Sequence, residues 1–334
     1  MYSSQTTDQK FNMIARRIMI FFGILMCILG LIGNCLNIFI FTVWYRSRKS
    51  PNKFSNFNRS RNSLLYLLVS SFANLIIIIY PLSTRILFDG YQYHINEPQI
   101  FIFCKFRYYI LHTFYLISLT TICMATFDRY LISSRNAHLR ELNSTKKQTI
   151  VIIVFICLFI GLHNIPIVFH FNLSFNGECL IFSSAYSYYY LYIVRISLEG
   201  LIPILFLSLF GILTFKQLRI LEKHNASNHL NSDRQVARML LLISITIIIS
   251  SIPNCIEHVY EIVFSYEDRR HSSSFFLFHV ISSILFYMNP VMSFYIFYIS
   301  TPNFRHQLRC FIPHKKTVKY FVKQEDSSKS VPLT

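Results

Sequence analysis

The sequence predicts an all-α membrane protein, a bundle of seven transmembrane helices followed by a short amphipathic eighth helix. Charged residues make up only 14% of the 334 residues and hydrophobic residues 53%, whereas a typical soluble protein is roughly 25% charged. Seven apolar stretches are also each long enough to cross a bilayer, which takes about 20 residues. Core helices of soluble proteins rarely repeat such long uncharged runs, so a soluble helical protein is excluded.

The seven predicted spans follow one another with short polar connections. In chain order they are Ile18–Trp44, Leu64–Phe88, Ile100–Met124, Ile150–Phe171, Tyr188–Phe215, Met239–Phe264 and Phe275–Ile299. Five of them contain a proline, at Pro81, Pro166, Pro203, Pro253 and Pro290. Proline ends a soluble helix but is tolerated in a membrane helix, where neighbouring groups satisfy the freed carbonyl.

The polar segments divide the chain further. We expect an extracellular N-terminal tail at residues 1–13, the seven-helix domain at 14–300, the eighth helix at 301–312 and a basic cytoplasmic tail at 313–334. Phe304, Leu308 and Phe311 share one face of that eighth helix, which is typical of a helix lying at a membrane surface. Cys310 at its end is a candidate for palmitoylation.

The distribution of charge predicts the orientation. The chain has 32 Lys and Arg against 15 Asp and Glu, and 23 of the basic but only six of the acidic residues lie after the first, third and fifth spans and in the tail. Lys and Arg collect in cytoplasmic loops, so the N-terminus is expected outside and the C-terminus inside. Lys10, Arg16 and Arg17 run against this rule. A charge placed by membrane topology gives no support to nucleic-acid binding, and lipid is the expected partner.

Two cysteines fall on the predicted outer side. Cys104 lies at the outer end of the third span and Cys179 in the following outer loop, and oxidising conditions there favour a disulfide between them. Asn172 begins an Asn-Leu-Ser glycosylation sequence in the same loop. The similar sequences at Asn58, Asn143 and Asn225 fall on the inner side and should stay unmodified.

The inner end of the third span carries a recognisable motif. In Asp128-Arg129-Tyr130, Arg129 stands 25 residues after Cys104, and Asp233 precedes Pro253 by twenty residues. Together with Gly33-Asn34 in span one, Ala73-Asn74-Leu75 in span two, and Pro203 and Pro253 in spans five and six, this resembles the rhodopsin-like G-protein-coupled receptors over residues 33–310. The resemblance implies that Asp128, Arg129, Tyr130 and Asp233 form the G-protein-coupling site.

The resemblance also implies a polar core, with departures from the family pattern. The expected core residues are Asn34, Asn74, Ser118, Asn289 and Tyr298. Ser250-Ser251-Ile252 stands where an aromatic residue is expected before Pro253, and Asn74 replaces an acid that holds sodium in many members. Span seven fits in two ways, with Asn289-Pro290 followed by Ser293, or with Tyr298 preceded by Phe294-Tyr295; we favour the second. The activation switch is therefore expected to differ from the usual one.

The outer halves of the spans point to a ligand class. Position 111, where amine receptors of this family carry a carboxylate, is Leu111, and the seventh span has no lysine for retinal. Ionisable residues at this depth mark binding sites by default, and the candidates are Arg85, Arg107, Arg195, Glu199, Glu257 and Glu261, with Tyr108, Tyr115, Tyr188, Tyr192 and Tyr260 between them. Arg195 and Glu199 alternatively pair with each other. His112, His163 and His279 are expected to be satisfied polar groups in the core.

The mixed charge most resembles neuropeptide receptors, including the FMRFamide-type group. We therefore expect a plasma-membrane receptor for an extracellular peptide that activates a heterotrimeric G protein and also meets arrestin. A chemosensory receptor for a small molecule, and less readily a transporter or channel, remain alternatives. The sequence shows no catalytic constellation, metal site or cofactor motif.

Overall fold

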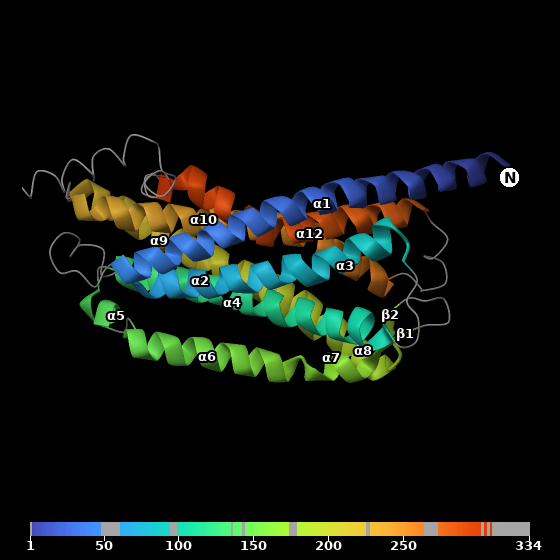
Figure 1. Cartoon of the computed structure of the whole chain (residues 1–334). Coiled ribbons are helices and arrows are strands. Elements are labelled where there is room, and N and C mark those ends of the chain that lie inside the picture. The colour runs from blue at the N-terminus through green and yellow to red at the C-terminus, as the bar shows by residue number, and fades with distance from the viewer. Residues whose placement is uncertain are drawn as a thin grey trace, which may run out of the picture.

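The fold is described from a computed structural model of the chain. The described residues are 2–47, 61–93, 99–134, 136–141, 144–173, 179–224, 228–263, 273–301, 304–305 and 308. Within them, seven helical segments are long and apolar enough to cross a membrane, which confirms the predicted seven-helix bundle (Figure 1).

Spans one to three are built from helices of two kinds. Span one is a single helix, α1 (Tyr2–Ser47). Span two consists of α2 (Arg61–Ile77), the π-helix η2 (Ile78–Leu82), α3 (Ser83–Arg85) and the π-helix η3 (Ile86–Gly90). Span three begins with the π-helix η5 (Phe101–Phe106) and continues as α4 (Arg107–Ser133), after which the short helix α5 (Ala137–Glu141) follows.

Spans four to seven complete the bundle. Span four comprises α6 (Lys146–His163) and α7 (Ile165–His170), and span five comprises α8 (Ser184–Tyr189), the π-helix η6 (Tyr190–Leu201) and α9 (Ile202–His224). Span six is α10 (Asn228–Val263) and span seven is α12 (Ser273–Ser300). Pro81 lies within η2 and Pro166 at the start of α7, whereas α10 and α12 continue through Pro253 and Pro290.

A small hairpin, which we did not predict from the sequence, lies between spans four and five. Strand β1 (Phe171–Leu173) pairs antiparallel with β2 (Cys179–Ile181), with Asn172 opposite Leu180. The hairpin lies at one end of the bundle (Figure 1). We call this end the disulfide end, because Cys179 is bonded there, and the opposite end the Arg129 end.

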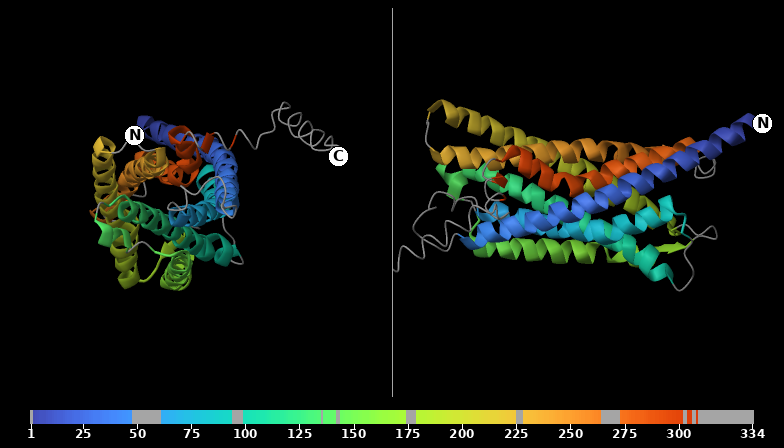
Figure 2. Two further views of the ribbon diagram at one scale, coloured as in Figure 1. Left: turned by 90° about the vertical axis from the view of Figure 1, so that its left-hand side faces the viewer. Right: turned by 45° about the horizontal axis from the view of Figure 1, so that its top comes forward.

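The third span forms the centre of the bundle. In an 18-residue stretch of each span, 72% of the residues of span three are buried, against 22% for span four at the periphery. Helix α1 packs against α12, and their approach is close because Gly33 faces the side chain of Phe294. The end-on view in Figure 2 shows the helices grouped around this core, and α1 projects beyond the other helices at its N-terminus.

Candidate functional site

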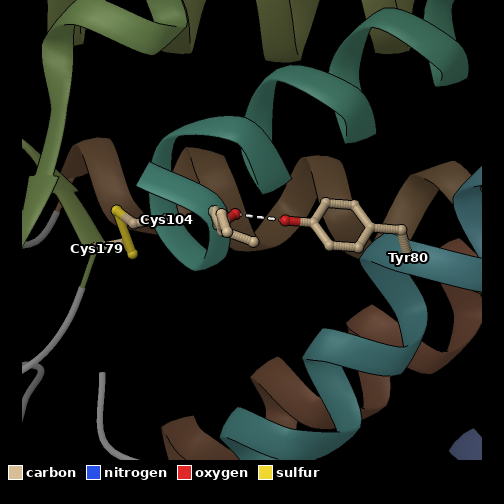
Figure 3. The surroundings of a disulfide bond; sticks show 4 residues. Tyr80, Cys104 and Cys179 are labelled. Atoms are coloured by element: carbon tan, nitrogen blue, oxygen red, sulfur yellow. Dashed lines mark hydrogen bonds between the residues drawn. A yellow bond between two sulfur atoms is a disulfide. The ribbon is translucent and has the colours of Figure 1, made fainter. Parts of the chain in front are cut away.

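The hairpin is held against span three by a disulfide. Cys104 in η5 and Cys179 in β2 are bonded, with their Cα atoms 5.6 Å apart, and Cys104 is fully buried with Ile167 and Phe171. Figure 3 shows the bond beside η5, where the Tyr80 hydroxyl donates a hydrogen bond to the carbonyl of Ile102. Span two, span three and the hairpin are therefore joined at one place.

A cavity of about 520 Å³ lies beneath the hairpin at the disulfide end. Spans two, three, five, six and seven contribute to its wall, together with β1 and β2. Its charged and aromatic lining includes Arg85, Arg195, Glu257, His279, Tyr108, Tyr190, Phe286 and Tyr287. Mostly apolar walls with a few convergent polar groups, in the volume range of roughly 300–1,000 Å³, are typical of small-ligand sites.

One polar network joins spans three and five at this cavity. His112 Nδ1 lies 2.6 Å from one oxygen of Glu199, and Arg195 donates to the other oxygen at 2.9 Å. The hydroxyl of Tyr190 lies 2.6 Å from His112 Nε2. The guanidinium of Arg195 also sits 5.8 Å from the ring of Phe286 in span seven. Pairing of Arg195 with Glu199 was one of the two alternatives read from the sequence.

A second network joins spans two, six and seven. Arg85 donates to His279 Nε2 and, at 2.9 Å, to the hydroxyl of Ser283. His279 Nδ1 contacts the carboxylate of Glu257, and Arg85 also pairs with Asp89. The side chain of Glu257 is 3% exposed and that of His279 is 31% exposed. The sequence identified Arg85 and Glu257 as candidates, and the structure adds His279 between them.

The remaining charged candidates occupy other positions. Arg107 is buried between the rings of Phe88 and Tyr108, at 5.0 and 5.2 Å from their centroids, and its Nε and Nη2 donate to none of the described residues. It does not line the cavity. Glu261 lies within α10, but its side chain is outside the described residues.

The predicted set of aromatic residues is corrected by the structure. Tyr108 lines the cavity, whereas Tyr188, Tyr192 and Tyr260 are exposed on the outside of the bundle. Tyr190 and Tyr287, which we did not single out, line it instead. Tyr190 begins η6, and a π-helix redirects side chains relative to a regular α-helix.

Four of the five predicted polar-core residues are buried. Asn34 donates to the carbonyls of Gly30 and Pro290, both at 2.9 Å, and Ser118 donates to Asn74 at 2.7 Å. Asn289 is also buried. Tyr298 is 37% exposed and stacks on Phe294, so its placement in the core was wrong. Ser293, earlier in α12, is buried in the bundle instead.

Ser293 receives a hydrogen bond from Asn37 at 3.3 Å. The contact joins span one to span seven one turn from the bonds of Asn34. Neither Asn37 nor Ser293 was selected from the sequence as a core residue. In the first of our two alignments of span seven, in which Asn289-Pro290 is followed by Ser293, this serine is a departure from the family pattern.

At the Arg129 end, Arg129 is 1% exposed and Asp128 is 5% exposed. Their closest charged atoms, Arg129 Nη2 and Asp128 Oδ2, are 4.0 Å apart. Ser63 of α2 bridges them, because its hydroxyl accepts from Arg129 Nε at 2.8 Å and donates to Asp128. The sequence gave no sign of Ser63. Asp233 lies in α10 with its side chain outside the described residues.

The remaining predicted sites lie at the two ends of the chain's membrane domain. Asn172 is exposed in β1. Phe304 is fully buried, with its ring 6.3 Å from Phe41 and 6.0 Å from Phe297, so the start of the predicted eighth helix packs on spans one and seven. Cys310 lies outside the described residues. Among the residues described, no three His, Cys, Asp or Glu side chains are grouped to hold a metal ion.

A bundle of seven membrane-length helices, with a cavity at one end and a buried arginine at the other, is the architecture expected of a seven-helix membrane receptor. Residues 58–293, more than two thirds of the chain, match the 7 transmembrane receptor (rhodopsin family). The chain belongs to this family of G-protein-coupled receptors. Its members are signalling receptors and not enzymes, and the family implies a G protein and membrane lipid as partners. No curated protein matches the chain significantly.

Proposed function

We propose that this receptor binds an extracellular neuropeptide in the cavity at the disulfide end and activates a heterotrimeric G protein at the Arg129 end of the bundle. The observation that carries the proposal is the mixed lining of the cavity. Arg85 and Arg195 offer donors to a carboxylate or carbonyl, and Glu257 offers an acceptor to an amino group. A peptide terminus carries both kinds of group, together with side chains that suit the tyrosine-rich wall.

The size of the cavity defines how much of a peptide enters it. About 520 Å³ holds the end of a peptide and not its whole length. The rest of the ligand would then lie against the hairpin, whose Ile181 and Cys179 line the cavity. Burial of a few residues in a preformed polar cavity supports the specific recognition of one terminus.

The orientation is part of the same proposal. Placing the disulfide end outside puts the Cys104–Cys179 bond on the oxidising side and Asn172 where glycosylation occurs. We expect receptor isolated from the plasma membrane to carry a glycan that a glycosidase removes. Asn172→Gln should lack this glycan and therefore migrate faster on a gel. A glycan attached at Asn143 would contradict this topology.

Coupling is proposed to run through Arg129. Once released from Asp128 and Ser63, its guanidinium would contact the end of the G protein that inserts into the bundle. A bound ligand would then activate the receptor by favouring the helix arrangement in which Arg129 is released. We also propose that Tyr130 and Asp233 take part in coupling, that Cys310 is palmitoylated, and that arrestin binds on the cytoplasmic side. Signalling that survived Arg129→Ala, together with measurable solute flux, would favour a transporter.

The ligand is best identified in cells that express the full chain with a promiscuous G protein. A library of amidated peptides is compared with a panel of small volatile molecules by their calcium response. We expect a peptide response that Glu257→Gln reduces at least roughly tenfold in potency, because a buried charge-assisted contact is lost. Glu141→Gln, at an exposed position in α5, should respond like the wild type.

One observation favours an alternative ligand class. The cavity volume also suits a whole small molecule, so a chemosensory receptor is the second candidate. Responses to the small molecules and none to the peptides in the same assay would establish it.

A further inference from the structure

Arg107 in span three is a buried cation for which the described residues supply no acceptor. The residue is 4% exposed, and its Nε and Nη2 donate no hydrogen bond within the described part of the chain. These two nitrogens share the edge of a guanidinium that binds a carboxylate through two parallel hydrogen bonds. An arginine does not lose its proton in a protein. A buried guanidinium without a counterion is therefore costly, and an anion bound near it would stabilise the fold.

Two aromatic rings hold the guanidinium of Arg107 in place. Its central carbon lies 5.0 Å from the ring centroid of Phe88 and 5.2 Å from that of Tyr108. The face of a ring attracts a cation, but it has no lone pair equivalent to that of a carboxylate oxygen. The rings therefore position the charge and leave it without a counterion.

Arg107 adjoins the cavity through residues that line it. Tyr108 and Tyr287 both belong to the cavity wall, and Tyr287 lies within electrostatic range of both Arg107 and Arg85. Arg85, which also lines the cavity, is paired with Asp89 one turn further along span two. We call Arg85, Asp89 and Arg107 the basic corner. It holds two guanidinium groups and one carboxylate.

The opposite wall of the cavity has the reverse balance. In span five, Arg195 pairs with Glu199, and span six adds Glu257, which lines the cavity. Among the guanidinium and carboxylate groups described around the cavity, the excess positive charge thus lies at spans two and three and the excess negative charge at spans five and six. Partly buried charges are weakly screened, so a carboxylate in the cavity is drawn toward the basic corner.

We infer that the basic corner is a carboxylate-binding subsite, which selects a ligand whose cavity-entering end carries a carboxylate. Arg85 contacts this carboxylate within the cavity, and Arg107 supplies the positive charge that no described carboxylate offsets. A free C-terminus and the side chain of an acidic residue both offer the group. The inference rests on the proposed function only in taking the cavity as the ligand site.

Acetate is the simplest probe of this subsite, and acetamide is its neutral counterpart of the same shape. The full-length receptor is placed in lipid nanodiscs without ligand or G protein, and sodium acetate replaces sodium chloride at constant ionic strength. We expect about 0.1 M acetate to raise the folding equilibrium in thermal unfolding roughly fivefold, as binding with a Kd of about 25 mM predicts. Acetamide at the same concentration should have no effect. A wild type that unfolds alike in acetate and in chloride would overturn the inference.

Substitutions of Arg107 separate its charge from its packing. Arg107→Gln should abolish the acetate effect, whereas Arg107→Lys, which keeps the charge, should retain most of it. Lys105→Gln is the matched control and should respond like the wild type, because Lys105 is a partly buried cation two residues earlier, in η5. If Arg107→Gln does not fold, Arg85→Gln provides the comparison from the cavity side. An acetate effect that persisted in the folded glutamine variant, or that Lys105→Gln also removed, would contradict the assignment.

A carboxylate of the chain itself is the competing occupant of the basic corner. Glu97 and Glu178 belong to connecting segments outside the described residues. We expect Glu97→Gln and Glu178→Gln to respond to acetate like the wild type. An acetate effect that appeared only in one of these variants would show that its glutamate already occupies the corner, and the inference would then be wrong.

The cell assay tests the same subsite with peptides. Each active amidated peptide is compared with its free acid and with a form in which Asn and Gln replace its Asp and Glu. We expect the forms without a carboxylate to be roughly tenfold less potent on the wild type, and all forms to be alike on Arg107→Gln. A loss on replacing the acidic residues identifies a side-chain carboxylate, and a gain in the free acid identifies a C-terminal one.

The two kinds of failure are distinguishable. Active peptides that need no carboxylate would overturn the inference and leave the proposed function standing. An absence of any peptide response, with the acetate effect intact, would reject the proposed ligand class and leave the subsite standing.

Discussion

At the scale of single residues, the Arg129 end depends on a serine. Arg129 and Asp128 are neighbours in the sequence, but their closest charged atoms are 4.0 Å apart and Ser63 bonds to both. Both charges are buried, and a buried charge that loses a hydrogen bond is costly. Ser63 therefore holds span two against span three at the site proposed to bind the G protein.

Substitution of Ser63 by alanine tests this role. We expect Ser63→Ala to raise basal G-protein activation roughly tenfold, because about 1.4 kcal/mol of restraint on Arg129 is removed. Nucleotide exchange on the G protein, normalised to receptor at the cell surface, provides the measurement.

The matched control for this variant lies on the same helix. Among the residues that the structure describes, the hydroxyl of Ser71 bonds only to the carbonyl of Leu67 one turn earlier, so Ser71→Ala should keep the basal rate of the wild type. If both alanine variants behaved alike, Ser63 would not restrain Arg129.

At the scale of elements, departures from the α-helix gather at the disulfide end. Within the described chain, the π-helices η2, η3, η5 and η6 all lie in the halves of spans two, three and five next to the hairpin. Such segments are frequent at functional sites, since they redirect side chains. In η6 the result is that Tyr190 and Arg195 face the cavity.

The close packing of α1 against α12 depends on a glycine. A Cβ atom at Gly33 would lie 2.9 Å from the Cβ of Phe294, whereas one at Gly211 in α9 would have no neighbour within 4 Å. The Cβ of Phe294 is fixed by the backbone of α12, so it cannot move aside as the end of a side chain would.

Valine at these two positions separates packing from helix propensity. We expect Gly33→Val to lower the free energy of unfolding by about 2 kcal/mol through overpacking, and Gly211→Val to leave it nearly unchanged. Thermal unfolding of the purified full chain measures both. Equal effects would show that α1 adjusts freely against α12.

At the scale of the whole molecule, two polar sites lie at opposite ends of one apolar bundle. The cavity is bounded by spans two, three, five, six and seven, and the disulfide fixes the hairpin over it. Span three reaches both sites, through Tyr108 at one end and Arg129 at the other. A change of helix arrangement at the cavity is therefore positioned to reach Arg129 through the central helix.

The two cysteines of the disulfide stabilise the bundle together, because neither forms the bond without the other. Cys104 and Cys179 are 75 residues apart, and we expect Cys104→Ser, Cys179→Ser and the double variant each to lose about 2 kcal/mol of unfolding free energy. The losses are equal because each variant removes the same bond.

A thermal-unfolding double-mutant cycle measures these losses, with the free cysteine variant Cys157→Ser as control. A double variant that lost the sum of the two single effects would indicate separate roles for the two cysteines.

The sequence alone determined that the fold is a bundle of membrane-spanning helices, and it identified Cys104 and Arg129 as residues near opposite ends of span three. Uncharged runs of membrane length permit no other backbone than helices, and the motif around Arg129 with the distant Cys104 indicated the family. Asn34, Asn74 and Ser118 were also predicted as core residues and are buried.

Only the tertiary structure decided which side chains meet. Ser63, Tyr190 and His279 carry no signal of their own in the sequence, because serine, tyrosine and histidine occur throughout the spans. Their partners are 65, 78 and 22 residues away, and contact over such separations depends on how the helices pack. Tyr298 was placed in the core by the family resemblance, and Tyr188 and Tyr192 were chosen because they lie near charged residues in the sequence. The packing of α12 and the π-helix η6 set which side chains turn inward.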